Sequence, residues 1–145
     1  MELIQRIITA LTELHPLHPM LVHFPIALTG AGALFILLAA WKKSQSLEQA
    51  AFANMVLAAL GTVAAGITGA MDNMNTYDGA APNATWKMIL AFALFIVTTW
   101  TSVARWRNPN LFTSRAKPLY VAAYFVSFLI AIVLAFLGGV ILYGF

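Results

Sequence analysis

The sequence predicts an all-α protein, a four-helix transmembrane bundle preceded by a short interfacial amphipathic helix. Hydrophobic residues make up 61% of the 145 residues and charged residues only 9%, which is too few charges to cover the surface of a water-soluble globule. The charges are also clustered, so that four long stretches contain no Asp, Glu, Lys or Arg. Lipid is therefore the expected solvent for much of the surface.

Residues 1–20 are predicted to form an interfacial arm. Its apolar residues recur at helical spacing with polar residues between them, at Leu3, Ile4, Ile7, Leu11 and Leu14. A helix of this kind lies in the plane of the membrane surface, and a frayed terminus is the alternative. No cleavage pattern of small residues follows an apolar core, so we expect the arm to be retained and not removed as a targeting peptide.

Residues 21–145 are predicted to form the four-helix transmembrane domain. The charge-free stretches cover 14–41, 49–71, 88–104 and 118–145. A span needs about 20 mainly apolar residues, and the shortest stretch reaches that length by including Lys87, whose aliphatic stem can lie along the bilayer. We therefore expect helices at 21–41, 48–71, 85–105 and 119–143.

The connections between the predicted helices contain residues that are typical of helix ends and turns. Ser46 to Gln49 is a capping-box pattern that opens the second helix, and Pro118 suits the first turn of the fourth. Gly79 and Pro82 interrupt the chain before the third helix. Within the second helix, Gly61, Ala65 and Gly69 form a small-residue stripe, which favours close packing inside this bundle over a dimer interface.

The positions of the cations predict the topology. Six of the eight Lys and Arg residues lie in the two loops that join helices one to two and three to four. The positive-inside bias then places those loops in the cytoplasm and both termini on the outer, periplasmic face of a bacterial inner membrane. Aromatic residues at the helix ends fit the two interfacial belts, with Trp41, Trp106 and Tyr120 inside and Tyr77, Trp86 and Tyr143 outside.

All three histidines, His15, His18 and His23, fall within nine residues. Pro16 and Pro19 disfavour helical dihedrals at His15 and His18, so we expect these two rings in a non-helical lead-in at the membrane surface. His23 is expected about one turn inside the first helix. Ionisable residues at membrane depth are costly and usually face a bundle interior or a cavity, which makes His23 the leading candidate for chemistry.

The predicted topology brings Asp72 to the same outer level as the histidines. Imidazoles and a carboxylate can ligate a transition metal, and a histidine near a helix end can be an axial ligand of haem. We therefore predict a metal site at His18, His23 and Asp72, or a haem b on His23 assisted by His18. The structural alternatives are headgroup hydrogen bonds for His15 and His18, and a hydrogen bond within the bundle, for instance between His23 and Asp72.

Several classes of protein are excluded or disfavoured. No cysteine is present, which removes thiolate metal sites and covalent haem attachment. No nucleophile and base pair, phosphate-binding glycine loop or carboxylate dyad is apparent, so we expect no catalytic residues and no catalytic activity of the chain's own. The net charge of +3 is placed for topology and predicts no nucleic-acid partner.

Three stretches resemble a family of bacterial membrane proteins known as domain of unknown function 2231. They are the histidine segment from His15 to Leu28, Gly66 to Asp72 at the end of the second helix, and Leu137 to Gly144. The resemblance implies a four-helix membrane domain whose relatives often adjoin c-type cytochrome or Rieske iron-sulfur modules. Members often carry a further histidine near the start of the third helix, where this chain has Thr85, Trp86 and Lys87.

Without this histidine, a haem that bridges helices one and three would lack its second histidine ligand. The haem would then have one histidine ligand alone, or its second ligand would be a methionine such as Met88 or a residue of another subunit, or no haem would bind. Two functions follow as hypotheses. The chain is a membrane subunit of a respiratory or other electron-transfer complex, holding haem b or a transition-metal ion, with cytochrome c or Rieske-type proteins as partners. Alternatively, it is a structural or assembly subunit without a cofactor.

Overall fold

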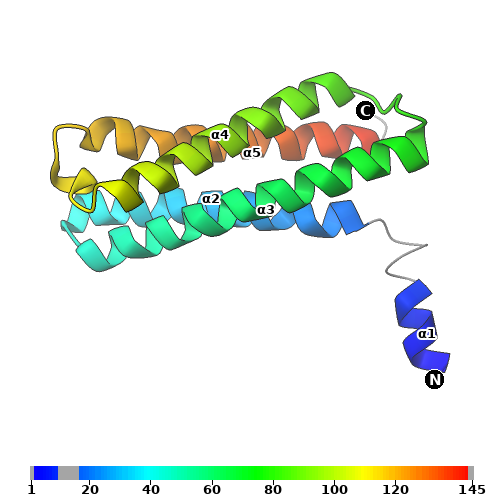
Figure 1. The fold of residues 1–145 in the computed structure, drawn as a ribbon, viewed down its shortest axis with the longest axis horizontal. Coiled ribbons are helices and arrows are strands. Elements are labelled where there is room, and N and C mark those ends of the chain that lie inside the picture. The colour runs from blue at the N-terminus through cyan, green and yellow to red at the C-terminus, as the bar shows by residue number, and fades with distance from the viewer. Residues whose placement is uncertain (1, 10–16, 144–145) are drawn as a thin grey trace.

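The computed structural model describes residues 2–9 and 17–143, and within them it confirms the all-α class (Figure 1). A short helix, α1 (Glu2–Thr9), precedes four long helices: α2 (Leu17–Lys42), α3 (Gln45–Tyr77), α4 (Ala84–Arg107) and α5 (Lys117–Tyr143). A 3₁₀ turn, η2 (Leu111–Thr113), lies between α4 and α5. Each long helix is apolar and long enough to cross a membrane.

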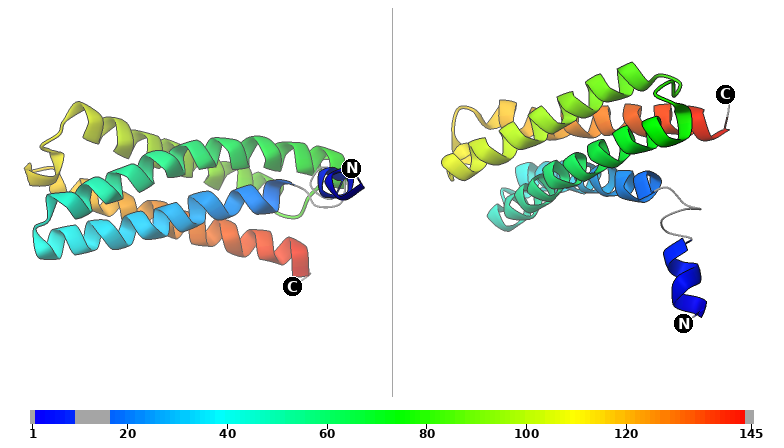
Figure 2. Two further views of the ribbon diagram at one scale, coloured as in Figure 1. Left: turned by 90° about the horizontal axis from the view of Figure 1, so that it is seen from below. Right: turned by 45° about the vertical axis from the view of Figure 1, so that its right-hand side comes forward.

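The four long helices run up and down as neighbours in a ring. Helix α2 packs against α3 and α5, and α4 packs against the same two helices. The bundle therefore has two ends, which we call the His18 end and the Glu48 end. At the His18 end α2 and α4 begin and α3 and α5 finish, and α1 lies beyond this end, apart from the bundle (Figure 2).

All four long helices start earlier than the sequence predicts and three of them end later, while α5 ends at Tyr143 as predicted. Helix α2 begins at Leu17, so His18 is helical and not in an extended lead-in. Pro19 is the third residue of the helix, where its missing amide would have had no intrahelical partner, so it does not prevent the helix from starting there. Helix α2 also continues through Pro25, and the Thr29 hydroxyl donates to the Pro25 carbonyl at 2.7 Å.

Helix α3 differs from expectation at both ends. Its N-cap is Ser44, whose hydroxyl accepts from the Leu47 amide at 3.4 Å, and not the predicted capping box at Ser46 to Gln49. At its other end the helix continues past Asp72 to Tyr77 and is closed by Asp78 in a left-handed conformation. No glycine or proline lies between Asp72 and Asp78 to stop it earlier.

The packed core lies towards the Glu48 end. It is built from small and medium side chains together with two tyrosines and the buried side of η2: Ala33, Ile36, Ala39, Ala51, Met55, Leu111, Phe112, Tyr120 and Tyr124. Several buried hydroxyls, such as those of Thr62 and Thr98, donate to carbonyls of their own helix and so need no partner helix, whereas the buried Thr99 hydroxyl has no hydrogen-bond partner among the described residues. Large apolar side chains such as Leu60, Phe92 and Phe136 are exposed on the outside, where lipid covers them.

The aromatic residues at the helix ends separate into two kinds. Trp41 and Trp106 are more than three-quarters exposed at the Glu48 end, with relative accessibilities of 77% and 76%, and Trp86 is exposed at the His18 end. These three suit interfacial belts. Tyr120 does not, because it is completely buried, so its predicted place in a belt is wrong. The Tyr143 side chain lies outside the described part of the structure.

Candidate functional site

The His18 end of the bundle contains a cavity of about 400 Å³. All four long helices contribute to its lining, and volumes of this order are typical of ligand sites. Its polar lining includes His18 and His23 from α2, Asp72 and Asn73 from α3, and Lys87 from α4. The predicted residues therefore meet around one space, although His15 lies outside the described residues.

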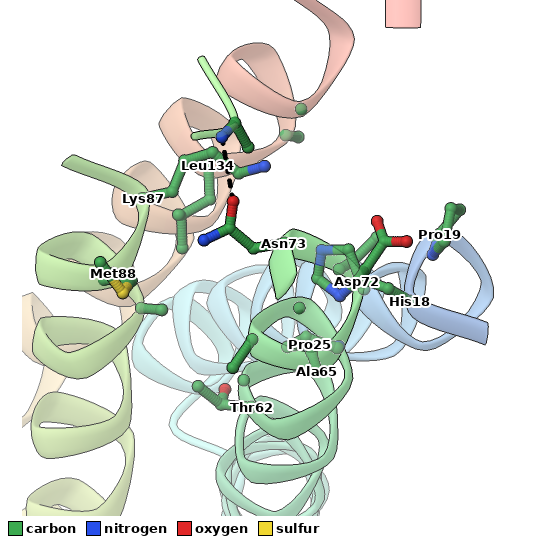
Figure 3. A pocket seen from close by; sticks show the side chains of 18 of the residues that line it. His18, Pro19, Pro25, Thr62, Ala65, Asp72, Asn73, Lys87, Met88 and Leu134 are labelled. Atoms are coloured by element: carbon green, nitrogen blue, oxygen red, sulfur yellow. Dashed lines mark hydrogen bonds between the residues drawn. The ribbon is translucent and has the colours of Figure 1, made fainter. Parts of the chain in front are cut away.

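His18 and Asp72 lie beside each other in this cavity (Figure 3). The His18 ring is half-buried, and its Nδ1 lies 3.4 Å from the Thr68 hydroxyl oxygen. That hydroxyl donates to the Ala64 carbonyl at 2.9 Å, so it is placed to accept a hydrogen bond from Nδ1. With the proton on Nδ1, Nε2 keeps its lone pair.

The small-residue stripe of α3 makes room for the His18 ring. A Cβ at Gly69 would lie 2.7 Å from the Cε1 atom of His18, closer than real Cβ contacts allow. Glycine at this position therefore lets the ring lie directly on the α3 backbone. The stripe packs inside the bundle, as the sequence predicts, because Gly61 likewise contacts Phe24 and Pro25 of α2.

Charged groups of both signs act on this ring. Asp72 and Lys87 both lie close enough to His18, and to each other, to interact electrostatically. One Asp72 carboxylate oxygen accepts from the Thr76 hydroxyl at 3.0 Å. The side-chain oxygen of Asn73 accepts from the Ala81 amide at 3.0 Å, and the side-chain nitrogen of Asn73 takes no part in this bond (Figure 3).

His23 is placed differently from His18. Its side chain is exposed at the rim of the cavity, and its Nδ1 contacts the carbonyl oxygen of Pro19, one turn earlier in α2. Five residues separate the two histidines, which places them about 140° apart around the helix. The hydrogen bond suggested by the sequence between His23 and Asp72 is replaced by the contact with Pro19.

Met88 also lines the cavity, next to Lys87 on α4 and across from His18 and Asp72 (Figure 3). Its side chain is exposed. Within residues 2–9 and 17–143, three or more His, Cys, Asp or Glu side chains do not come together in a way that could hold a metal ion. Among the described residues, His18 and Asp72 thus provide two adjacent ligand groups, and His23 and Met88 lie at other points of the lining.

A second polar cluster, at the Glu48 end, is absent from the predictions. Glu48 is completely buried and receives two hydrogen bonds from Arg105, from Nε at 2.6 Å and from a terminal nitrogen at 2.8 Å. The Tyr120 hydroxyl donates to Glu48 at 2.8 Å and lies 2.9 Å from the Tyr124 hydroxyl. The Glu48 cluster, comprising these four residues, links α3, α4 and α5.

The sequence contained two signals for this cluster. Tyr120 and Tyr124 are four residues apart, which places them on one face of a helix, and Glu48 is an acidic residue in the first turn of α3. The sequence instead suggested a capping box around Glu48 and a loop position for Arg105. Both side chains were therefore expected to be exposed to water. A buried bidentate pair satisfies both charges without water, which is why the structure can place them inside.

The fold and its cavity define an integral membrane protein with four membrane-spanning helices. The chain belongs to the family described as "Predicted membrane protein (DUF2231)", which matches residues 14–145. The resemblance found in the sequence is thereby confirmed. Neither the search of curated proteins nor the search of solved structures found a match.

Proposed function

We propose that the protein is a subunit of a membrane electron-transfer complex, and that the cavity at its His18 end binds the redox-active ligand. The observation that carries the proposal is the meeting of His18, Asp72 and Lys87 from three helices around one cavity. Ionisable side chains in membrane helices are costly, so their convergence on a ligand-sized space favours a binding role over a structural one.

The resemblance to relatives that adjoin c-type cytochrome or Rieske modules supports this class of function and suggests those proteins as partners. We place the His18 end at the periplasmic side of the bacterial inner membrane. The argument for this orientation is that Lys42, Lys43, Arg107, Arg115 and Lys117 all lie at the Glu48 end. The pairing of Arg105 with Glu48 removes one cation from this count without reversing the bias.

A haem b would be held by two residues of the lining. The contact of His23 Nδ1 with the Pro19 carbonyl leaves Nε2 as the atom available for ligation, which is the common arrangement for ligating histidines. Met88, on α4, is the candidate for a second ligand. When bound, a haem would supply one-electron transfer. A transition-metal ion at His18 and Asp72 would need further ligands besides these two.

An optical spectrum and metal analysis of the protein purified in mild detergent test the cofactor part. If haem binds through His23, the wild type shows a haem spectrum and His23→Ala loses at least about 90% of it, since removing an axial ligand removes most of the affinity. If a metal binds, His18→Ala and Asp72→Asn lose it and His23→Ala loses less. His23→Ala retaining the full haem content would contradict ligation by His23.

The second candidate is a structural or assembly subunit without a cofactor. It is favoured by the Glu48 cluster, which links three helices through buried hydrogen bonds and gives the bundle a defined arrangement. Under this alternative, deleting the protein disrupts assembly of its complex, while His23→Gln, Asp72→Asn and the double variant leave activity intact. Loss of activity with assembly preserved would support the electron-transfer role instead.

A further inference from the structure

The cavity at the His18 end has walls of unusually small residues. Glycine and alanine from α3, α4 and α5 make up much of its lining: Ala65, Gly66, Ala70, Ala84, Ala91, Ala131, Ala135, Gly138 and Gly139. A Cβ built at Gly66, Gly138 or Gly139 would meet no atom of the described residues within 4 Å. Larger side chains would thus fit at these positions. The space stays open because these residues are glycines.

An open space of this kind is unfavourable in a membrane bundle. In lipid, helices are held together by packing contacts and not by water expulsion. Side chains that face an empty cavity therefore lose van der Waals contacts that they would make in a packed interior. The floor of the cavity is apolar and buried at Leu94 and Ala131, and the one hydroxyl there, that of Thr62, is satisfied by the Ala58 carbonyl. An apolar group is therefore the suitable occupant of the inner part.

The mouth of the cavity is polar and balanced in charge. Asp72 can only accept hydrogen bonds when ionised, Lys87 can only donate, and His18 and Asn73 can each do either. One cation and one anion lie here, so a ligand with a net charge would be attracted by one and repelled by the other. The complementary polar group of a ligand carries no net charge and both donates and accepts hydrogen bonds.

We propose that this cavity binds a lipid-soluble quinone or its quinol, with the oxygenated ring between His18, Asp72 and Lys87 and the apolar tail along the glycine and alanine walls. A quinol hydroxyl can donate to Nε2 of His18 or to the Asp72 carboxylate, and an oxygen of either the quinol or the quinone can accept from the Lys87 ammonium group. A fatty acid or an anionic phospholipid carries a net negative charge, which Lys87 would attract but Asp72 would repel. The inference rests on the proposed electron-transfer role and names the ligand of that site.

The test uses the full chain, stripped of lipid in detergent, and a short-tailed benzoquinone as the probe. Binding is measured for the quinone and its quinol, with oleate and phosphatidylglycerol in parallel, by extraction of bound ligand after gel filtration and by titration. Gly66→Leu and Gly139→Leu each fill the cavity from a different helix. Ala53→Leu, an exposed position on the same helix as Gly66, is the matched control.

We expect stoichiometric quinone binding by the wild type and by Ala53→Leu. Each cavity-filling variant should lower the affinity by at least about tenfold, and Asp72→Asn should weaken the quinol more than the quinone. Circular dichroism and gel filtration identify variants that fold. If one cavity-filling variant does not fold, the other and Asp72→Asn decide the result.

Unchanged quinone affinity in a folded cavity-filling variant would overturn the inference. So would preferential binding of oleate or phosphatidylglycerol, or a metal ion held by His18 and Asp72. Co-purification of redox subunits from native membranes is scored separately. Redox partners without quinone binding would leave the proposed function and reject the ligand, whereas quinone binding without redox partners would reject the proposed function alone.

Discussion

Replacing Glu48 with alanine is expected to lower the free energy of unfolding by about 3–5 kcal/mol, the usual cost of removing one partner of a buried ion pair. Glu48 is completely buried, and the Arg105 side chain is only 12% exposed, so the remaining guanidinium would keep little access to water. The Tyr120 hydroxyl would also lose its acceptor. Reversible unfolding in detergent micelles, followed by circular dichroism, measures the change.

The matched control for this prediction is Arg107→Ala. Arg107 is exposed and lies two residues beyond Arg105 on the same helix, so its removal should change the unfolding free energy by less than about 1 kcal/mol. Tyr120→Phe tests the network more gently and should cost about 1–3 kcal/mol, because it removes only the hydroxyl. Equal unfolding free energies for the wild type and Glu48→Ala would show that the pair contributes nothing.

Gly61→Leu is expected to lower the free energy of unfolding by about 1–3 kcal/mol, the typical cost of overpacking a closely packed contact. A Cβ at Gly61 would lie 3.3 Å from Pro25 Cδ and 3.5 Å from the Pro25 backbone nitrogen. The proline ring is rigid and belongs to the helix backbone, so it cannot rotate away from the leucine. Helices α2 and α3 would have to separate at this contact.

Gly66→Leu is the control for this second prediction. It makes the same chemical change on the same helix, but a Cβ at Gly66 would meet no described atom within 4 Å. In the absence of ligand, its unfolding free energy should equal or exceed that of the wild type, because leucine is the better helix former. Similar losses in both variants would indicate a general effect of leucine in α3 and not a close contact with Pro25.

The fold was largely predictable because the signals that specify a membrane bundle are long and local. Four charge-free stretches determine four spans, and turn residues such as Gly79 mark the connections. The ends of the helices were less predictable, since Ser44 and Ser46 are both good caps and the sequence does not show which one is used.

The candidate site was predicted in part because the order of the helices determines which residues share an end of the bundle. Successive helices of the bundle run in alternating directions, which places His18, Asp72 and Lys87 at the same end. Their grouping followed from that alone. The orientation of each ring did not, because it depends on contacts such as His18 with Gly69, between residues far apart in the chain. The Glu48 cluster was missed because a local interpretation, as a cap or a loop cation, was available for each charged member.

The length of α3 has a consequence for the surroundings of the protein. Its 33 residues correspond to about 50 Å of helix, whereas the hydrocarbon layer of a bilayer is about 30 Å thick. A helix this long must tilt steeply or project into the headgroup layer. Projection at its C-terminal end would raise Asp72 and Thr76 to the depth of the phosphates, where protons exchange freely with bulk water.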